Sequence, residues 1–230
     1  GATSKGGLII QLSQMNQILE IDIPNRLAVI QPGVINAHLS QETRPFGFHF
    51  APDPSSQSAS TIGGNFAENA GGPHTLKYGV TTNHVLGATI VMADGNVRKF
   101  GGRYRYNQGL DLLGLICGSE GTLGIATEII VNLVPNPKIT RTFLLTFDEV
   151  SNATNCVSAI IEGGVIPAAL EMIDQLCIRA VETKLDAGFP VNAGAVLLVE
   201  IDGDLESVEL ECEILQQVVK HFTAHPIEEA

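Results

Sequence analysis

Long apolar runs are missing from this sequence of 230 residues. Every hydrophobic stretch is interrupted by glycine, proline or a charged residue, and none approaches the ~18 residues that a membrane-spanning helix needs. Charged residues are sparse, at 17% against 44% hydrophobic residues, which excludes an intrinsically disordered chain. The composition therefore predicts a folded globular protein without a membrane span, large enough for one big or two modest cores.

Cysteine pairs of the CxxC type are also absent. The four cysteines, Cys117, Cys156, Cys177 and Cys212, lie far apart in the sequence. No histidine stands at metal-ligand spacing from a carboxylate, and no signal peptide is visible. We therefore expect reduced thiols in a cytoplasmic protein and no metal site.

Several motifs that would point to other enzyme classes do not occur. The sequence has no GxGxxG, Walker A, HExxH or GxSxG pattern. Its most regular glycines, Gly118, Gly121 and Gly124, are spaced three apart and follow an apolar segment with helical spacing instead of a strand. A nicotinamide dehydrogenase, a kinase and a hydrolase therefore have no support in the sequence.

Positive charge is scarce in the second part of the chain. Nine basic and nine acidic residues stand in the chain through Lys138, against four and sixteen from Ile139 onward, so the second part accounts for the whole net charge of −12. The change coincides with Val134–Pro135–Asn136–Pro137 and predicts one domain at 1–137 and another at 138–230. The acidic part disfavours nucleic acid and anionic lipid as partners, but not a protein subunit.

The first part has the pattern of short strands and loops. Alternating apolar residues predict hairpins at 18–31 and 86–100, and the turn Asp94–Gly95 of the second hairpin favours type I′. Residues 110–117 have helical spacing, and 122–134 are predicted to form a long strand rich in β-branched residues.

The second part alternates strands and helices instead. Strands are predicted at 142–147 and 195–201, and helices at 152–161, 169–185 and 207–222. The sequence as a whole thus predicts an α+β fold, with an incomplete ferredoxin-like arrangement in the second domain.

Glycine is concentrated where large side chains are few. Two Gly-Gly pairs, Gly63–Gly64 and Gly71–Gly72, stand among small or polar residues. Such a segment lets the backbone approach a ligand and adopt positive φ angles, which is typical of main chain that lines a large flat or anionic molecule. Taken singly, each Gly-Gly pair is equally typical of an ordinary loop. Residues 118–124 are equally typical of a helix C-cap followed by a tight turn.

The order of these segments resembles the FAD-linked oxidase family, the PCMH-type flavin domain shared by the glycolate oxidase flavoprotein subunit and D-lactate dehydrogenase. The segments that carry the resemblance are, in order, Pro32–Gly33–Val34, Pro52–Asp53–Pro54–Ser55–Ser56, Ile62–Gly63–Gly64–Asn65, Asn69–Ala70–Gly71–Gly72, Tyr78–Gly79 and Gly118–Ser119–Glu120–Gly121–Thr122–Leu123–Gly124. Leu170–Glu171–Met172–Ile173–Asp174 in the second part also fits the glycolate oxidase branch. One such match is weak, and the ordered set is specific.

The resemblance implies FAD as the cofactor. It implies a second FAD-binding subdomain, whose N-terminal part with its pyrophosphate loop is missing, followed by the start of a ferredoxin-like cap domain. The implied cofactor-binding residues are Pro52, Ser56, Gly63, Gly64, Asn65, Asn69, Gly71, Gly72, Tyr78, Gly79, Gly118, Gly121, Gly124 and Ile125.

Each implied segment has an expected role toward the cofactor. The amides around Gly63–Gly64 and the side chains of Asn65 and Asn69 are expected to bind the pyrophosphate and the polar edge of the flavin. Gly71–Gly72 would pass against the isoalloxazine or the ribityl chain, and 118–125 would close the adenine and ribose side. His74 is expected to support its loop, and Glu120 serves structure as readily as cofactor binding.

The implied reaction is oxidation of a small D-2-hydroxy acid, glycolate or D-lactate, by hydride transfer to flavin N5, with partner subunits of a glycolate oxidase complex as possible partners. The family's HxGDGNxH-like and GEHG-like motifs do not occur. The base histidine is therefore expected outside this chain, and the 230 residues alone are expected to be about half an enzyme, to hold FAD weakly and to be inactive. The alternative from another class is a non-catalytic binding or assembly subunit, or an inactive fragment.

Overall fold

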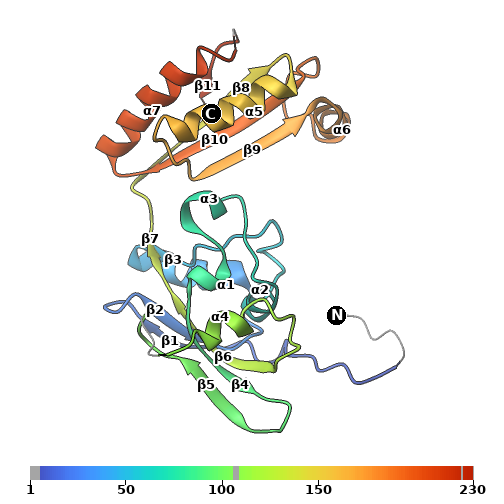
Figure 1. Ribbon diagram of the computed structural model, residues 1–230, viewed down its shortest axis with the longest axis vertical. Coiled ribbons are helices and arrows are strands. Elements are labelled where there is room, and N and C mark those ends of the chain that lie inside the picture. Colours follow the sequence, from blue (N-terminus) through green and yellow to red (C-terminus); the bar gives the residue numbers. More distant parts are fainter. Residues whose placement is uncertain (1–5, 106–108, 224, 230) are drawn as a thin grey trace. The chain divides into compact units, whose positions relative to one another are not determined.

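The computed structural model describes residues 6–105, 109–223 and 225–229 of the chain. The chain divides into two compact units, Gly1–Asn136 and Pro137–Ala230, and each unit has a hydrophobic core of its own. Mixed helices and antiparallel sheets give an α+β fold, as predicted (Figure 1).

The first unit is built on a five-stranded antiparallel sheet in the order β1-β2-β6-β4-β5. Its strands are β1 (Ile18–Asp22), β2 (Leu27–Ile30), β4 (Val85–Val91), β5 (Val97–Gly101) and β6 (Ile125–Asn132). Both predicted hairpins are present, and the predicted long strand is the central strand β6.

The turn of the second hairpin differs from the predicted type I′. That type needs positive φ at both central residues, whereas Gly95 has φ +80° and Asp94 has no positive φ. The Gly95 amide donates to the Met92 carbonyl at 2.9 Å, and the Met92 amide donates to Asn96 O at 2.9 Å. The connection is therefore a three-residue loop. Of the two residues expected to have positive φ, Gly95 has it and Asp94 does not.

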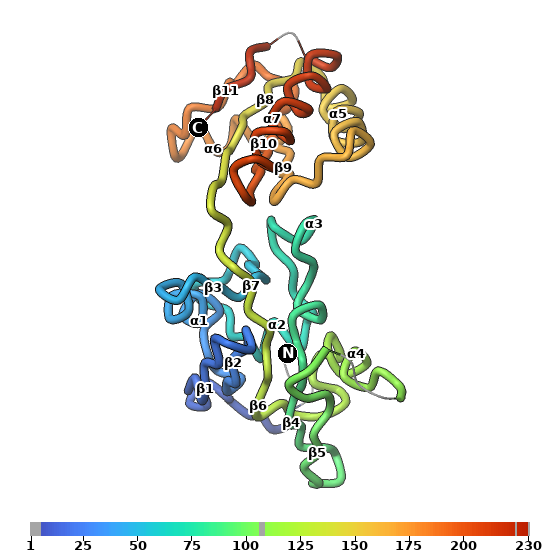
Figure 2. Tube along the Cα trace, turned by 90° about the vertical axis from the view of Figure 1, so that its left-hand side faces the viewer, coloured from blue at the N-terminus to red at the C-terminus, as the bar shows by residue number. Residues whose placement is uncertain are grey.

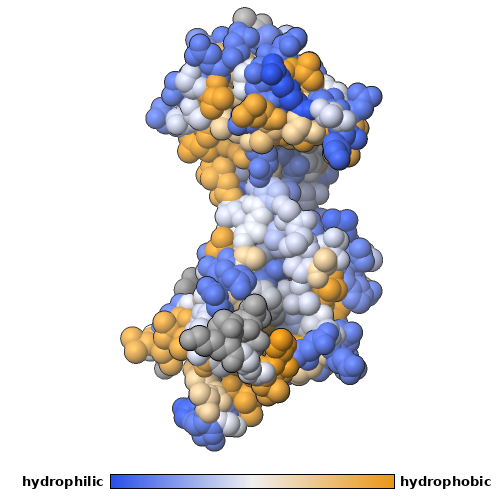
Figure 3. Space-filling view, turned by 90° about the vertical axis from the view of Figure 1, so that its right-hand side faces the viewer, coloured by the Kyte–Doolittle hydropathy of each residue, from blue (hydrophilic) through white to orange (hydrophobic). Residues whose placement is uncertain are grey.

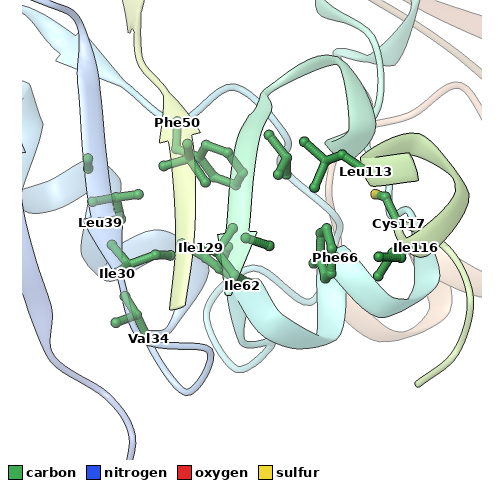
Figure 4. Packing of buried hydrophobic residues seen from close by; sticks show 14 of the residues in the cluster. Ile30, Val34, Leu39, Phe50, Ile62, Phe66, Leu113, Ile116, Cys117 and Ile129 are labelled. Carbon is green, nitrogen blue, oxygen red and sulfur yellow. The ribbon is translucent and has the colours of Figure 1, made fainter. Parts of the chain in front are cut away.

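Short helices and loops complete the first unit. The shorter elements are α1 (Asn36–Thr43), η1 (Arg44–Phe46), β3 (Phe48–His49), α2 (Ile62–Glu68), α3 (Thr75–Tyr78), η2 (Thr81–Asn83), α4 (Leu112–Ile116) and β7 (Val134–Pro135). Leu39, Ile62 and Phe66 from the helices pack against Ile30 and Ile129 of the sheet (Figure 4). This core fixes α2, and so fixes the segment that carries the first Gly-Gly pair.

The second unit contains a four-stranded antiparallel sheet in the order β11-β8-β10-β9. Its elements are β8 (Ile139–Phe147), α5 (Val150–Glu162), β9 (Ala169–Asp174), α6 (Gln175–Leu185), β10 (Ala195–Gly203), α7 (Leu205–Val219) and β11 (Glu228–Glu229). In chain order the strand sequence is 4-1-3-2, which is the ferredoxin-like arrangement, and the end of the chain returns beside β8 (Figure 2).

The two faces of this sheet are covered differently. Phe143, Leu145 and Val199 point to the face that packs against α5 and α7. Ile178 of α6 packs with Val196 on the opposite face. The alternation along β8 and β10 sorts the apolar residues between the two faces.

One predicted helix was partly wrong. The helix expected at 169–185 begins only at Gln175, and Ala169–Asp174 is strand β9, which pairs along β10. The missed signal is Asp174, whose Oδ1 accepts a hydrogen bond from the Cys177 amide at 2.8 Å and caps α6. With β9 and β11 included, the described part of this unit has all four ferredoxin-like strands instead of the incomplete set expected.

In the described ranges of the chain, no helix combines the length and the apolar character needed to cross a membrane. On the face that Figure 3 shows, the first unit has separate apolar patches among hydrophilic and intermediate residues. Exposed apolar side chains near α4 include Leu112, Leu115 and Leu123.

Candidate cofactor cleft and the loops around it

A cleft of about 420 Å³ follows α2 along its length in the first unit. One wall comes from α2 and its entry, and the other comes from the glycine turn that precedes β6. The lining residues are Ile10, Leu12, Pro32, Thr61, Gly63, Gly64, Phe66, Ala67, Glu68, Ile116, Ser119, Glu120, Gly121, Gly124, Ile125 and Ala126. The shared glycine density of residues 63–72 and 118–125 predicts that the two segments lie side by side, and the lining of this cleft confirms it.

Two backbone hydrogen bonds hold the walls together. The Gly118 amide donates to Phe66 O and the Glu120 amide donates to Ala67 O, both at 2.8 Å. Gly118 and Gly121 have φ of +82° and +74°, a region that side chains other than glycine rarely enter. The glycines of this turn are therefore required by its conformation.

The amides of the first Gly-Gly pair are already hydrogen-bonded within the protein. Gly63 N donates to Pro32 O at 2.8 Å, and Gly64 N donates to Thr61 Oγ1 at 3.1 Å. A Cβ on Gly63 would lie 2.4 Å from the Pro32 Cβ. The expected role of these amides as donors to a pyrophosphate is therefore not supported, and Gly63 is glycine because α2 packs so closely on Pro32.

The glycine turn offers the donors that the Gly-Gly pair lacks. Among the described residues, the amides of Gly121 and Gly124 have no hydrogen-bond acceptor, and both residues line the cleft. A backbone N–H is a strong donor that a ligand or water must satisfy. These two amides are therefore the groups most ready to bind an acceptor in the cleft.

The Asn65 side chain belongs to a buried hydrogen-bond chain. Its Nδ2 donates to Asn36 Oδ1 at 2.9 Å, and Asn36 Nδ2 donates to the Pro52 carbonyl at 2.9 Å. Asn36 is fully buried and Asn65 is only 3% exposed. The amide group of Asn65 thus fixes the loop that begins at Pro52 instead of reaching outward.

Asn36 was not predicted from the sequence. Its only sequence signal is a polar residue on the face of α1 that also carries the buried Leu39. In the same loop, the Ser56 carbonyl accepts from the Ala59 and Ser60 amides at 2.8 and 2.7 Å and closes a turn. The expected cofactor contact of Ser56 stays a prediction.

Asn69 ends α2 and joins three segments. It has φ +51°, and its Oδ1 accepts from the Thr82 amide at 2.9 Å and from Cys117 Sγ at 3.7 Å. Burial raises the pKa of the Cys117 thiol, so this thiol stays protonated as a donor at neutral pH. Asn69 therefore connects the end of α2 to the start of the glycine turn.

Three further predicted glycines are explained by packing within the chain. A Cβ on Gly71 would lie 2.4 Å from Thr75 Oγ1, one on Gly72 would lie 2.3 Å from Asp53 O, and one on Gly79 would lie 2.5 Å from Asn83 Oδ1. Each of these distances is shorter than real Cβ contacts allow, which accounts for glycine at each position. Close approach to a flavin at Gly71, Gly72, Tyr78 or Gly79 stays a prediction.

His74 forms a close pair with a carboxylate from another loop. Its Nδ1 lies 2.6 Å from Asp53 Oδ2, and its ring is tilted against the Tyr78 ring at a centroid distance of 6.3 Å. The expectation that His74 supports its loop agrees with this contact. Spacing along the sequence did not reveal this pair, because 21 residues separate Asp53 from His74.

His84 lies buried beneath the same region, at 3% exposure. Its Nε2 donates to the Tyr78 carbonyl at 2.7 Å, and its Nδ1 has no hydrogen-bond partner among the described residues. Burial lowers the pKa of His84 below its ordinary value. The ring is therefore neutral at physiological pH and supports the Tyr78 carbonyl.

No group of three or more His, Cys, Asp or Glu side chains in the described ranges could hold a metal ion.

Two family models match the chain. The FAD binding domain model matches residues 1–101, and the model for the C-terminal domain of FAD linked oxidases matches residues 136–230.

Curated relatives agree with these matches. The glycolate oxidase subunit GlcD of Bacillus subtilis is 43% identical over 99% of this chain and 48% of its own length, and GlcD of Escherichia coli K12 is 44% identical over 93% and 43%. The D-lactate dehydrogenase of Anaerostipes hadrus is 35% identical over 92% of this chain and 46% of its own length. The chain spans about half the length of the curated relatives it matches.

Solved structures show the same fold at low identity. An alkyldihydroxyacetonephosphate synthase superposes with a TM-score of 0.80 and 22% identity over 95% of this chain and 43% of its own. A p-cresol methylhydroxylase gives a TM-score of 0.77 and 18% identity over 94% and 48%. The chain belongs to the FAD-linked oxidase family and contains its FAD-binding domain followed by its C-terminal domain.

Proposed function

We propose that the protein acts in FAD-dependent oxidation of a D-2-hydroxy acid, with glycolate or D-lactate as the substrate. The observation that carries this proposal is the identity of 43–44% with two glycolate oxidase subunits along more than nine-tenths of the chain. The solved structures, at 18% and 22% identity, support the fold alone.

The residues of the cleft fit one end of FAD better than the other. Its walls combine apolar side chains such as Phe66 and Ile116 with the free donors of Gly121 and Gly124. Glu68 and Glu120 also line it. Carboxylates repel a diphosphate and accept hydrogen bonds from hydroxyl groups, so we assign the cleft to the adenine and ribose end.

The remaining predicted residues belong to the same proposed site. One group positions the loops beside α2: Pro52, Ser56, Asn65, Asn69, Gly71, Gly72, Tyr78 and Gly79. A second group forms or supports the cleft: Gly63, Gly64, Gly118, Gly121, Gly124 and Ile125. FAD, when bound, supplies the hydride acceptor, and the chain binds and orients it.

The relatives also suggest partners and a location. Two of them are named as subunits of glycolate oxidase, so we include a further protein subunit among the partners. A cytoplasmic location is supported by four free cysteines, of which Cys177 is exposed, because an exposed free thiol is typical of a reducing compartment.

The test is anaerobic flavin reduction. Since the chain spans about half the length of its relatives, the protein is expressed from its complete reading frame, with the 230-residue chain prepared beside it. We expect a yellow complete protein that bleaches when glycolate or D-lactate is added without oxygen. A yellow protein that no D-2-hydroxy acid reduces, but a phenol or an aromatic alcohol does, would contradict the proposed function.

A further inference from the structure

The side-chain amide of Asn69, at the end of α2, has an orientation that the protein fixes. A backbone N–H only donates, so the atom that accepts from the Thr82 amide at 2.9 Å is the oxygen, Oδ1. The Cys117 thiol donates to the same oxygen, with Sγ 3.7 Å away. Both lone pairs of Oδ1 are therefore used. If the amide group turned over, its own N–H groups would face these two donors.

The nitrogen of the same amide group is not used within the described ranges of the chain. Asn69 Nδ2 has no hydrogen-bond acceptor there, whereas Asn65 Nδ2 donates to Asn36 Oδ1 at 2.9 Å. Asn69 is half-buried, and Asn65 is buried. Asn69 thus offers a ligand two N–H donors and no acceptor, so the ligand atom that it binds must be an acceptor.

Asn69 lies at one end of the cofactor cleft. It directly follows Glu68, which is the last residue of α2 and lines the cleft. It also packs on the opposite wall, because a Cβ on Gly118 would lie 3.1 Å from the Asn69 Cβ. The Gly118 amide donates to the carbonyl of Phe66, another lining residue. A ligand that extends from the cleft past this end of α2 therefore reaches Asn69.

Beyond its adenosine, FAD has two kinds of acceptor oxygen, those of the diphosphate and the carbonyl oxygens of the flavin ring. Resting on the proposed function, we propose that Asn69 Nδ2 donates to one of these oxygens and that Cys117 is a positioning residue. The thiol, together with the Thr82 amide, keeps Oδ1 turned inward and Nδ2 available. The sequence predicts only that Cys117 is reduced, and this contact gives the thiol a role in the site.

The experiment uses the apoprotein from the complete reading frame. Asn69→Asp keeps an acceptor for both donors and tolerates the φ of +51° at this position, but it replaces Nδ2 by an oxygen. Asn83→Asp is the matched control. Asn83 Oδ1 also accepts a backbone amide, that of Val80, at 2.9 Å, and Asn83 does not line the cleft.

Titration with FAD, followed by quenching of flavin fluorescence, measures the affinities. Asn69→Asp should bind FAD ~10-fold more weakly or worse, because a donor is lost and a negative charge faces an acceptor oxygen, while Asn83→Asp stays within about threefold of wild type. Cys117→Ala should lose about threefold, since a thiol is a weak donor, and Cys117→Ser, which keeps a donor, should bind as wild type does. In nitrogen NMR of wild-type protein labelled at asparagine, FAD should shift the side-chain amide signal of Asn69 and not that of Asn83.

ADP and riboflavin identify the acceptor oxygen, because ADP has the diphosphate without the flavin and riboflavin has the flavin without the diphosphate. Weaker binding of ADP by Asn69→Asp assigns Nδ2 to the diphosphate. Weaker binding of riboflavin assigns it to a carbonyl of the ring. Unchanged binding of FAD, an equal loss in Asn83→Asp, or an Asn69 amide signal that FAD does not shift would overturn the assignment of Asn69. A Cys117→Ser variant that binds as weakly as Cys117→Ala would overturn the positioning role of the thiol.

Flavin reduction separates this proposal from the proposed function. If Asn69→Asp binds FAD more weakly but neither glycolate nor D-lactate reduces the flavin of the wild type, the function fails and the assignment of Asn69 stands. If either acid reduces the wild type and Asn69→Asp binds FAD equally well, the function stands and the assignment is wrong.

Discussion

At the scale of single residues, Gly121 and Gly95 make a matched pair. Both have positive φ, +74° and +80°, and a Cβ on either would meet no atom within 4 Å. Alanine at either position should therefore cost a similar ~1 kcal/mol of unfolding free energy. Only Gly121 lines the cleft and offers a donor there.

Gly121→Ala keeps the amide but strains the turn that positions it, so we predict that FAD binding weakens about tenfold, equivalent to ~1.4 kcal/mol, while Gly95→Ala leaves it unchanged. Titration of the apoprotein with FAD, followed by quenching of flavin fluorescence, measures both. Equal affinities in the two variants would show that the cleft does not hold the cofactor.

His84 predicts how stability depends on pH. Burial holds the pKa of His84 in the folded protein below the ordinary 6.5. At a pH between these two pKa values the side chain is protonated in the unfolded chain and neutral in the folded protein. The unfolding free energy is then fully present above about pH 6.5 and falls as the pH is lowered through that window, by up to ~1.4 kcal/mol per pH unit.

The variant for this prediction is His84→Gln, whose side-chain amide can still donate to the Tyr78 carbonyl. Urea denaturation at about pH 7.5, 6.5 and 5.5 should show the loss in the wild type and a flatter profile in the variant. Parallel profiles would mean that another group causes the pH dependence.

The residue scale also shows what sequence patterns can predict of the site. Glycine density and the lack of large side chains predicted that the Gly63 segment and the turn around Gly121 would lie side by side, because one extended ligand would contact both. Which amides remain free was not predictable, since Gly63 is satisfied by Pro32, more than thirty residues earlier. The Asp53–His74 pair was hidden for the same reason.

At the scale of elements, the Asn36–Asn65 chain holds α1, α2 and the Pro52 loop together. In Asn65→Ala the buried Oδ1 of Asn36 loses its donor, which should cost about 1–3 kcal/mol of unfolding free energy in the first unit. Asn152→Ala, at an exposed position of α5, is the control and should be near neutral.

Hydrogen exchange offers a second readout of this prediction. In Asn65→Ala the amides near Pro52 and at the start of α2 should exchange faster, while those of β8 and β10 keep their protection. A uniform change over both units would show that the asparagines contribute to stability without joining these elements.

The element scale also explains the main error in the predicted fold. Residues 169–185 contain apolar spacing that suits a helix, and nothing local forces their first six residues into a strand. The register of β9 is set by β10, where Leu170 pairs with Val199 and Met172 with Leu197. Tertiary pairing overrides local propensity here, whereas the hairpin β4–β5 was predictable because its two strands are adjacent in sequence.

At the scale of the whole molecule, the charge boundary and the structural boundary coincide. Residues 1–136 have eight basic and nine acidic residues, a net charge of −1, and residues 137–230 have five and sixteen, a net charge of −11. Each unit has its own core. We therefore predict two thermal unfolding transitions, and only one of them should respond strongly to salt.

The acidic unit should be the salt-sensitive one, because its like charges are dense. Helix α7 contains four glutamates and no basic residue, and Glu209 and Glu213 repel each other at i,i+4 spacing. Two of its ion pairs, Lys138–Asp204 and Arg141–Glu229, lie at the surface and contribute little that salt could remove. Raising NaCl from about 10 to about 200 mM shortens the screening length from roughly 30 Å to below 10 Å, so the repulsion weakens.

In calorimetry the transition of this unit should move to higher temperature while the other stays fixed. A single transition, or two that move together, would mean that the units unfold as one body despite their separate cores.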